Sequence, residues 1–277
     1  MHHGTEYVGA ALDSCPTQTL ADLEVVLVLA QGDAASAAYA GSIADARVHM
    51  LHAGAGLSLA MQWNAGVARA RGHHLMVMTD TERLEPDTLE RMLALMPPDS
   101  GIECVYAAFR VHDLSTGRAQ AIASSADAQD ACFGRVNPCY VFTRSARERV
   151  GGWDPCSEPA VILDHWIRLF RACDVRHCDA VLCESVVYPW RTKNPDWIDL
   201  GLMEAAVRQR HQLDELSALR PWLRRYIVGI WKRPGDWRLL WRWFAPTGRR
   251  LRSMRRSPCA RSPTPRRDGC AEARCRQ

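Results

Sequence analysis

Two groups of side chains in this sequence stand where they could do chemistry. Asp80 and Glu82 follow the apolar run at 75–78, and Asp164 and His165 stand at the head of an apolar segment. Carboxylate oxygens are the ligands that Mg²⁺ prefers, so Asp80 and Glu82 could hold a divalent cation. A positioned Asp or His can take a proton from a reacting hydroxyl. Asp164, with His165 as the alternative, is therefore a candidate general base.

Each of these assignments has a plainer alternative. Asp80 and Glu82 could be solvated acids of a loop, where most acidic residues are found. Asp164 could serve only as the cap of a helix. Alternate side chains of a strand share a face, which favours Asp80 acting with Glu82, although a turn relaxes that rule. The adjacent histidines His73 and His74 would face opposite ways on a strand, so they do not predict a metal site.

The scaffold for these residues can be predicted from the apolar patterns. In the first hundred residues, short buried-strand runs alternate with helical patterns. We expect strands at 23–30, 47–52 and 75–78, and helices at 10–19, 34–46, 57–70 and 87–96. This alternation favours an α/β fold with a mostly parallel sheet and helices on both faces. Ligands of such sheets bind beyond the carboxyl ends of the strands, where Asp80 and Glu82 lie.

The second half of the chain continues with strands and one clear helix. We expect strands at 104–111, 139–143 and 183–188, and a helix at 164–173.

In their order, several segments resemble family 2 glycosyltransferases of the GT-A fold. The matching segments are 10–14, 18–20 and 23–28; 56–58, 64–67 and 70–72; 84–89; 141–145 and 150–154; and Tyr188 with Arg191. Asp164 heads the helix where that family keeps its catalytic carboxylate. The resemblance implies a Rossmann-like GT-A domain that moves a sugar, with inversion, from a UDP- or GDP-sugar donor to a surface-polysaccharide or lipid-linked acceptor.

The resemblance also suggests residues that bind substrates. Asn64, Trp153 and Arg191 are candidates for donor or acceptor binding. Trp153 could stack on a sugar ring or could be a core tryptophan under a turn. Arg191 could bind a phosphate as a bidentate donor or could form a surface ion pair. The acidic pair would hold Mg²⁺ or Mn²⁺ against the departing diphosphate.

The sequence departs from the family pattern at two places. Thr79 and Thr81 occupy the positions of the family's two metal-binding aspartates, which displaces Asp80 and Glu82 by one residue. The segment that would form the family's first strand is missing, so we expect an amino-terminally truncated domain. The alternative function is therefore a catalytically inactive protein that keeps the fold, or a scaffold with a basic tail.

Charge is divided unevenly along the chain. The net charge is +4, but residues 220–277 hold 17 Lys and Arg against three acidic residues, and residues 1–219 hold 18 against 28. Tryptophans alternate with arginines at helical spacing in residues 220–244, a composition typical of interfacial helices.

We expect a transferase domain at 1–205, amphipathic helices at 206–247 and a disordered basic tail at 248–277, with residues 220–256 on an anionic membrane surface. The alternative is a helix pair packed on the domain. Nucleic acid is a less favoured partner, because no reading motif accompanies the basic residues.

The remaining features concern the cellular compartment. There is no signal-peptide pattern and no apolar run of spanning length. The 11 cysteines are scattered, without a C-x-x-C pair. We therefore expect reduced thiols and a cytoplasmic protein attached peripherally to the inner face of the cell membrane.

Overall fold

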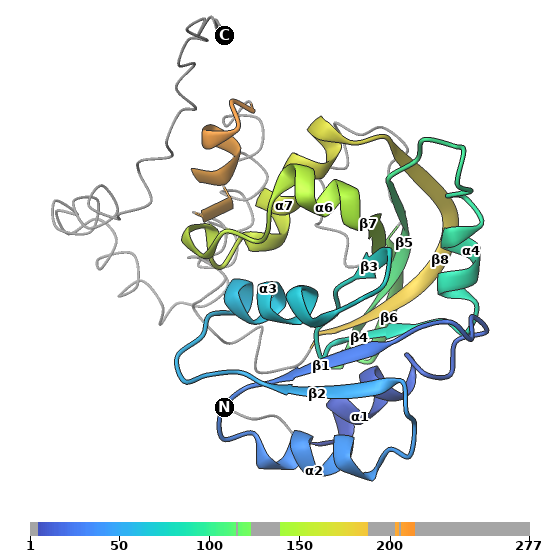
Figure 1. The fold of residues 1–277 in the computed structure, drawn as a ribbon, viewed down its shortest axis with the longest axis vertical. Helices are drawn as coiled ribbons and strands as arrows, with labels where there is room; N and C mark the ends of the chain where they lie inside the picture. The colour runs from blue at the N-terminus through green and yellow to red at the C-terminus, as the bar shows by residue number, and fades with distance from the viewer. Residues whose placement is uncertain (1–4, 115, 123–138, 188–202, 205, 214–277) are drawn as a thin grey trace, which may run out of the picture. The chain divides into compact units, whose positions relative to one another are not determined.

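The structure is a computed structural model that describes residues 5–114, 116–122, 139–187, 203–204 and 206–213. Its secondary structure is the α/β alternation that the sequence predicts (Figure 1). The chain divides into a unit at 1–222 and a second unit at 223–277, which lies wholly outside the described residues, as do Arg191 and the predicted membrane-binding segment. In the described part, no helix has both the length and the apolar character needed to cross a bilayer.

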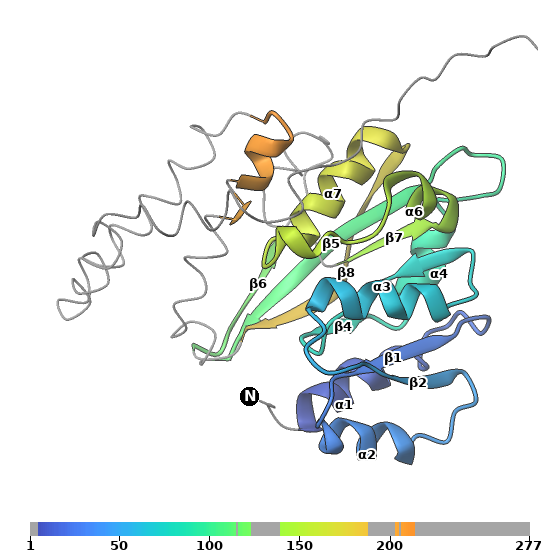
Figure 2. The ribbon, with the colours of Figure 1, turned by 60° about the vertical axis from the view of Figure 1, so that its left-hand side comes forward.

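The first half alternates helices and strands. Its elements are α1 (Thr5–Asp13), β1 (Val25–Leu29), α2 (Ala34–Ser42), β2 (Val48–His52), α3 (Leu59–Arg69) and β3 (His74–Met76). β1 and β2 form a two-stranded parallel sheet in which Val25 pairs with Val48 and Leu29 with His52. α3 lies on one side of this pair and α1 on the other in both ribbon views (Figure 2).

The second half forms a larger mixed sheet. Its elements are β4 (Glu82–Leu84), α4 (Thr88–Leu93), β5 (Cys104–Asp113), β6 (Arg118–Ile122), β7 (Tyr140–Thr143), α6 (Arg144–Val150), the 3₁₀ helix η1 (Pro155–Ser157), α7 (Val161–Ala172) and β8 (Val175–Val187). The strand order is β3-β7-β5-β8-β4, with β6 paired to β5.

The sheets of the described residues are less parallel than the sequence suggests. Only β1–β2 and β5–β8 are parallel, whereas β3–β7, β4–β8, β5–β6 and β5–β7 are antiparallel. The prediction came from the strand–helix alternation of the first hundred residues. It could not foresee β6, which joins β5 through a turn at Gly117 (φ +66°), or the short β4.

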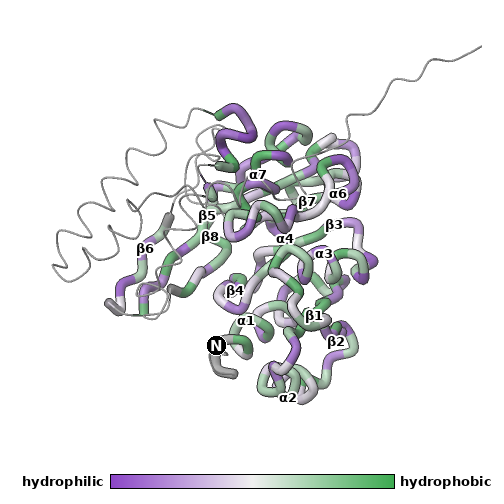
Figure 3. The backbone as a smooth tube through the Cα atoms, turned by 90° about the vertical axis from the view of Figure 1, so that its left-hand side faces the viewer, coloured by the Kyte–Doolittle hydropathy of each residue, from purple (hydrophilic) through white to green (hydrophobic). Residues whose placement is uncertain are grey.

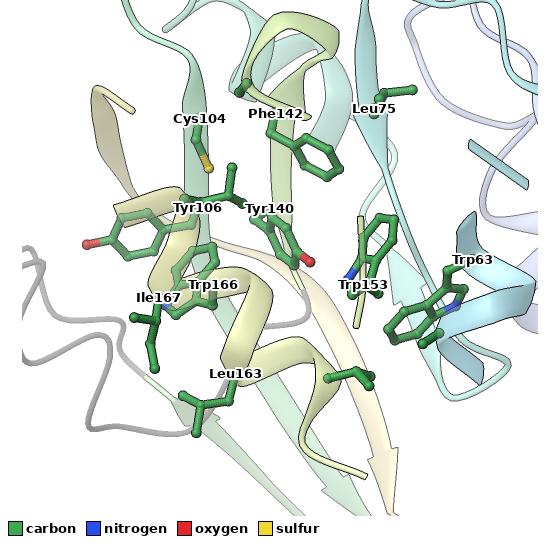
Figure 4. Close-up of a cluster of buried hydrophobic side chains, with 14 of the residues drawn as sticks. Trp63, Leu75, Cys104, Tyr106, Tyr140, Phe142, Trp153, Leu163, Trp166 and Ile167 are labelled. Atoms are coloured by element: carbon green, nitrogen blue, oxygen red, sulfur yellow. The ribbon is translucent and has the colours of Figure 1, made fainter. Parts of the chain in front are cut away.

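Helices cover both faces of the larger sheet, as predicted. Alternate residues of β5 and β7 enter two separate cores, because successive side chains of a strand point to opposite faces. Tyr106 and Tyr140 face the helices α3 and α7, together with Trp63, Trp153 and Trp166 (Figure 4). Val105, Ala107 and Val141 face α4 on the other side.

α7 carries the candidate base, and its start differs from the prediction. The helix begins at Val161 and not at Asp164, because Val161 and Leu163 are buried in the core and extend the apolar face by one turn. Ala160 is the N-cap residue, so Asp164 lies within the first helical turn. An acidic side chain there is favoured by the partial positive charge of the helix start.

The segment at 203–213 packs on the same domain. Val207 is fully buried in the core that α7 shares with α3, and Met203 and Leu213 pack against it. Residues 203–204 and 206–213 lie on either side of the predicted boundary at 205/206, which stays a prediction.

One expectation about the cysteines is wrong. Cys156 is disulfide-bonded, whereas the six other described cysteines are free thiols. The chain is therefore not wholly reduced in this structure.

Candidate active site

The acidic turn after β3 is organised by Glu82. The Glu82 side chain is 7% exposed, and its Oε2 accepts hydrogen bonds from the Thr79 backbone N–H and from the Thr79 hydroxyl (2.6 Å). Its Oε1 accepts from the Thr81 hydroxyl at 3.1 Å. Both oxygens of Glu82 are therefore engaged inside the turn, which begins β4 and directs Asp80 outward.

This arrangement does not fit the expected pair of metal ligands. Asp80 is exposed, but the Glu82 carboxylate is buried and bound to the two threonines. Among the described residues, no three His, Cys, Asp or Glu side chains gather closely enough to hold a metal ion. A divalent cation needs several oxygen ligands, and Asp80 alone supplies too few. Mg²⁺ or Mn²⁺ stays a prediction of the sequence.

Asp164 is the centre of a second polar cluster. The residue is 2% exposed, and Arg168, one turn later on α7, donates from Nε to its Oδ2 at 3.0 Å and lies 2.8 Å from it through Nη2. His211 Nε2 lies 2.9 Å from Oδ1, and Arg210 Nη1 lies 3.8 Å from the same oxygen. Each oxygen of the buried carboxylate thus has a hydrogen-bonded partner.

These partners keep Asp164 ionised. Burial by itself raises the pKa of a carboxyl, because it penalises the charged form. Here the hydrogen bond from His211, together with the charge and hydrogen bond of Arg168, outweighs burial and holds the pKa of Asp164 below its usual range. At neutral pH the site therefore contains a carboxylate, which is the protonation state that a general base requires.

Arg168 also fixes the glycine turn that precedes η1. Its Nη1 donates to the carbonyls of Val150 and Gly151 (3.3 Å to Gly151), and its Nη2 donates to the carbonyl of Gly152 at 2.7 Å. One guanidinium thus joins the Asp164 carboxylate to three consecutive carbonyls of the turn.

Arg210 and His211 were not foreseen from the sequence. They lie on the segment at 203–213, and Arg210 also donates to Asp154 Oδ2 and to Ser157 Oγ, both at 3.0 Å. No local pattern could indicate this contact, because 47 residues separate His211 from Asp164. The spacing of Asp164 and Arg168, by contrast, is that of neighbours on a helix face and could have been noticed.

His165, the alternative base, lies in the core. Its side chain is fully buried and stacks on Trp153 with ring centroids 4.4 Å apart. Among the residues that the structure describes, neither ring nitrogen has a hydrogen-bond partner. Burial and the charges of Arg168 and Arg147 lower the pKa of His165 to about 3. A neutral ring with no access to solvent is poorly placed to take a proton from an acceptor.

Asn64 and Trp153 are brought together, but as structural partners. Asn64 Nδ2 donates to the Trp153 carbonyl at 2.8 Å, and Asn64 Oδ1 accepts from the Trp153 N–H at 3.1 Å. The Trp153 ring is 1% exposed and meets Trp63 edge-on, with centroids 5.5 Å apart. This geometry favours the core alternative for Trp153, and it makes Asn64 the link between α3 and the glycine turn.

Comparison with known proteins supports the fold. The model of the family described as glycosyl transferase family 2 matches residues 2–149. No curated protein matches the sequence. Two similar solved structures are titled crystal structures of S. aureus TarS. One has 12% identity and a TM-score of 0.55 and covers 77% of this chain and 39% of that chain. The other, of TarS 1–349, has 11% identity and a TM-score of 0.56 and covers 77% and 64%. The chain thus spans less than two thirds of each neighbour, and the likeness shows the fold alone.

The close approach of Asn64 to the glycine turn can be tested by Gly152→Ala. A Cβ at position 152 would lie 2.2 Å from Asn64 Oδ1 and 2.5 Å from Arg147 Nη2, so both side chains would have to move. We expect the free energy of unfolding to fall by about 1–3 kcal/mol, the usual cost of overpacking. Gly54→Ala is the control, because a Cβ there meets nothing within 4 Å. Chemical denaturation measures the free energy of unfolding of both glycine variants. The loss caused by Gly152→Ala should be smaller when Asn64 is already replaced by alanine. An equal loss in both backgrounds would show that this contact is not the cause.

The buried His165 makes the fold sensitive to acid. Its folded-state pKa of about 3 lies below the unfolded value of about 6.5. Between these values the unfolded chain takes up a proton that the folded chain refuses, so stability falls as the pH falls from about 6.5. His165→Phe should keep its stability at pH 7 and lose less of it down to pH 4, as measured by denaturation at each pH. His52→Phe, at an exposed histidine, should follow the parent curve. A His165→Phe curve parallel to that of the parent would contradict the assignment.

Proposed function

The chain belongs to glycosyl transferase family 2, and from this premise we propose that it moves a sugar from a UDP- or GDP-sugar onto a glycan or lipid-linked acceptor. The observation that carries the proposal is the Asp164 carboxylate. It is ionised, it is held by Arg168, and it lies on the helix where the family resemblance places the catalytic carboxylate. The transfer would invert the configuration of the sugar.

In the proposed reaction the acceptor hydroxyl takes the place of His211 at Asp164 Oδ1. The carboxylate accepts the hydroxyl proton as the acceptor oxygen attacks the anomeric carbon, and the bond from that carbon to the nucleotide diphosphate breaks on the opposite face. When the acceptor displaces His211 from Oδ1, Asp164 loses one of the contacts that lower its pKa. The carboxylate would thus become a stronger base as the acceptor binds.

Arg168 would keep the carboxylate in place during that exchange. Arg168 binds Oδ2 of Asp164 and is itself held by the carbonyls of the glycine turn, so the position of its side chain does not depend on His211. A base that is fixed through one oxygen and open at the other can meet a hydroxyl without reorienting.

A second candidate function is a family member that keeps the fold without turnover. The engaged Glu82 and the threonines at positions 79 and 81 favour it, because donor binding in this family is expected to rely on carboxylates at that turn. The two candidates differ in a single measurable property, which is transfer of sugar from the donor.

The Asp164→Asn substitution tests the base. With UDP- or GDP-sugars and a glycan acceptor, we expect turnover to drop by about 10²-fold or more while donor affinity stays close to that of the parent. Asp45→Asn is the matched control, since within the described residues the Asp45 side chain bonds to the neighbouring Arg47 and lies apart from Asp164. A near-parent rate for Asp164→Asn would rule out Asp164 as the base and direct attention to His211. Donor-induced thermal stabilisation without turnover in the parent would favour the inactive family member.

Membrane association through residues 220–256 remains a proposal from the sequence. The basic and tryptophan-rich composition should bind vesicles that contain anionic lipid, at roughly 1 kcal/mol per Lys or Arg near the surface. Sedimentation with such vesicles should weaken in high salt, and neutral vesicles should bind much less. A chain ending at Leu219 should stay in the supernatant. Equal sedimentation of the full and shortened chains would contradict this part of the proposal.

A further inference from the structure

The carboxylate proposed as the base is closed to an acceptor in this structure. Asp164 is buried, and each of its oxygens already has a hydrogen-bonded partner. On the Oδ1 side its neighbours are Arg210 and His211, near the end of the segment at 203–213. That segment, orange in Figures 1 and 2, lies beside α7 in both ribbon views. An acceptor hydroxyl can therefore reach Oδ1 only after the turn at 210–213 moves away.

The contacts that hold this turn are polar and lie close to solvent. Arg210 donates to Asp154 Oδ2 and to Ser157 Oγ, both at 3.0 Å, yet 45% of its side chain is exposed. Arg171 of α7 donates to the His211 carbonyl. Ion pairs and hydrogen bonds that water can replace contribute much less to stability than buried ones. These contacts can therefore open without unfolding the domain.

The apolar anchor of the segment lies ahead of the turn. Val207 is fully buried in the core between α3 and α7, whereas Leu213 is only partly buried. Residues 208–212 between them are all hydrophilic, and Figure 3 colours this stretch beside α7 accordingly. Movement of the turn would thus expose little apolar surface. Val207 would keep the segment on the domain while the turn is open.

Gln212 makes the closed turn less stable than it could be. Its φ is +55°, the only positive φ of a residue other than glycine in the described part of the chain. The Leu213 N–H donates to the Arg208 carbonyl, and the Gln212 N–H to the Gln209 carbonyl, both at 2.9 Å. Gln212 therefore occupies the position after a helix end where glycine is usual. A side chain disfavours the left-handed conformation that this position requires.

We propose that residues 210–213 are an autoinhibitory latch, which covers the acceptor side of Asp164 in the resting protein and opens when an acceptor binds. Its effect on sugar transfer rests on the proposed function, but its opening does not. Arg168 stays on Oδ2 and on the glycine turn when the latch opens, so the carboxylate keeps a partner throughout. The apparent affinity for an acceptor is then the affinity of the open form, reduced by the fraction of molecules that are open.

Hydrogen exchange in the full chain tests the latch without turnover. The His211 N–H donates to the Val207 carbonyl at 3.0 Å, so its exchange reports the opening of the turn. In the parent, the His211 amide should exchange roughly 10²-fold faster than the amides of β5, because the latch opens while the core stays folded. Arg210→Gln should speed His211 exchange by roughly a further tenfold, since charge-assisted hydrogen bonds are lost. Gln209→Ala is the matched control, because Gln209 is exposed on the same segment.

Gln212→Gly should act in the opposite direction. Glycine adopts the left-handed conformation at no steric cost, so the closed turn should be more stable and His211 exchange should slow by roughly fivefold. Two variants with opposite effects separate the opening of the latch from a general loss of stability. Equal exchange rates of the His211 and β5 amides in the parent would overturn the proposal, because the segment would then open only with the whole domain. Unchanged His211 exchange in both variants would overturn it as well.

Turnover with UDP- or GDP-sugar donors tests the consequence for the acceptor. Arg210→Gln should lower the KM of the acceptor by about the factor found in hydrogen exchange, and Gln212→Gly should raise it. The KM of the donor should stay unchanged in both variants. Faster His211 exchange with an unchanged acceptor KM would overturn the latch as a barrier to the acceptor. A parent chain without turnover would contradict the proposed function, whereas the exchange rates would still decide whether the latch opens.

Discussion

The charge of Asp164 must be neutralised inside the protein, and several separate elements meet to do it. Burying a carboxylate without partners is prohibitively costly, so α7 supplies Arg168 and the segment at 203–213 supplies Arg210 and His211. Arg168 in turn satisfies the carbonyls of the glycine turn. Asn64 then ties that turn to α3 through the backbone of Trp153. The positions of α3, α7 and the turn are thus linked through one buried charge.

The strands show which parts of the fold the sequence could predict and which it could not. The strands β1, β3, β5 and β7 were found because each lies in an apolar run, and such runs mark buried strands. β4 and β6 were missed because they are short or polar, and their pairing with β8 and β5 is set by tertiary contacts. β8 was predicted too short, since its first half mixes charged residues with apolar ones and is held by pairing to β5.

The site shows a similar division. Asp164 was identified by its position on a helix, and the structure adds a reason for it to be ionised. Asn64 and His165 lie on helices that the sequence predicted and Trp153 lies in the expected turn, but their burial and backbone contacts could not be seen from residue types. The acidic pair is the reverse case. Asp80 and Glu82 have the right chemistry, yet two neighbouring threonines engage Glu82 within its own turn.

The free thiols offer a consequence of another kind, since the labelling rate of a buried thiol reports how often its surroundings open. Cys104 lies at the start of β5 with no exposed surface, and burial raises the pKa of its thiol. Burial likewise raises the pKa of Cys15, just after α1, to about 11. Only an exposed thiolate reacts quickly with a labelling reagent, so the fully buried Cys104 reacts at the rate at which its own region opens, whereas the partly buried Cys15 can be labelled in the folded chain. The labelling of Cys104 therefore times the opening of the larger sheet in the unaltered chain.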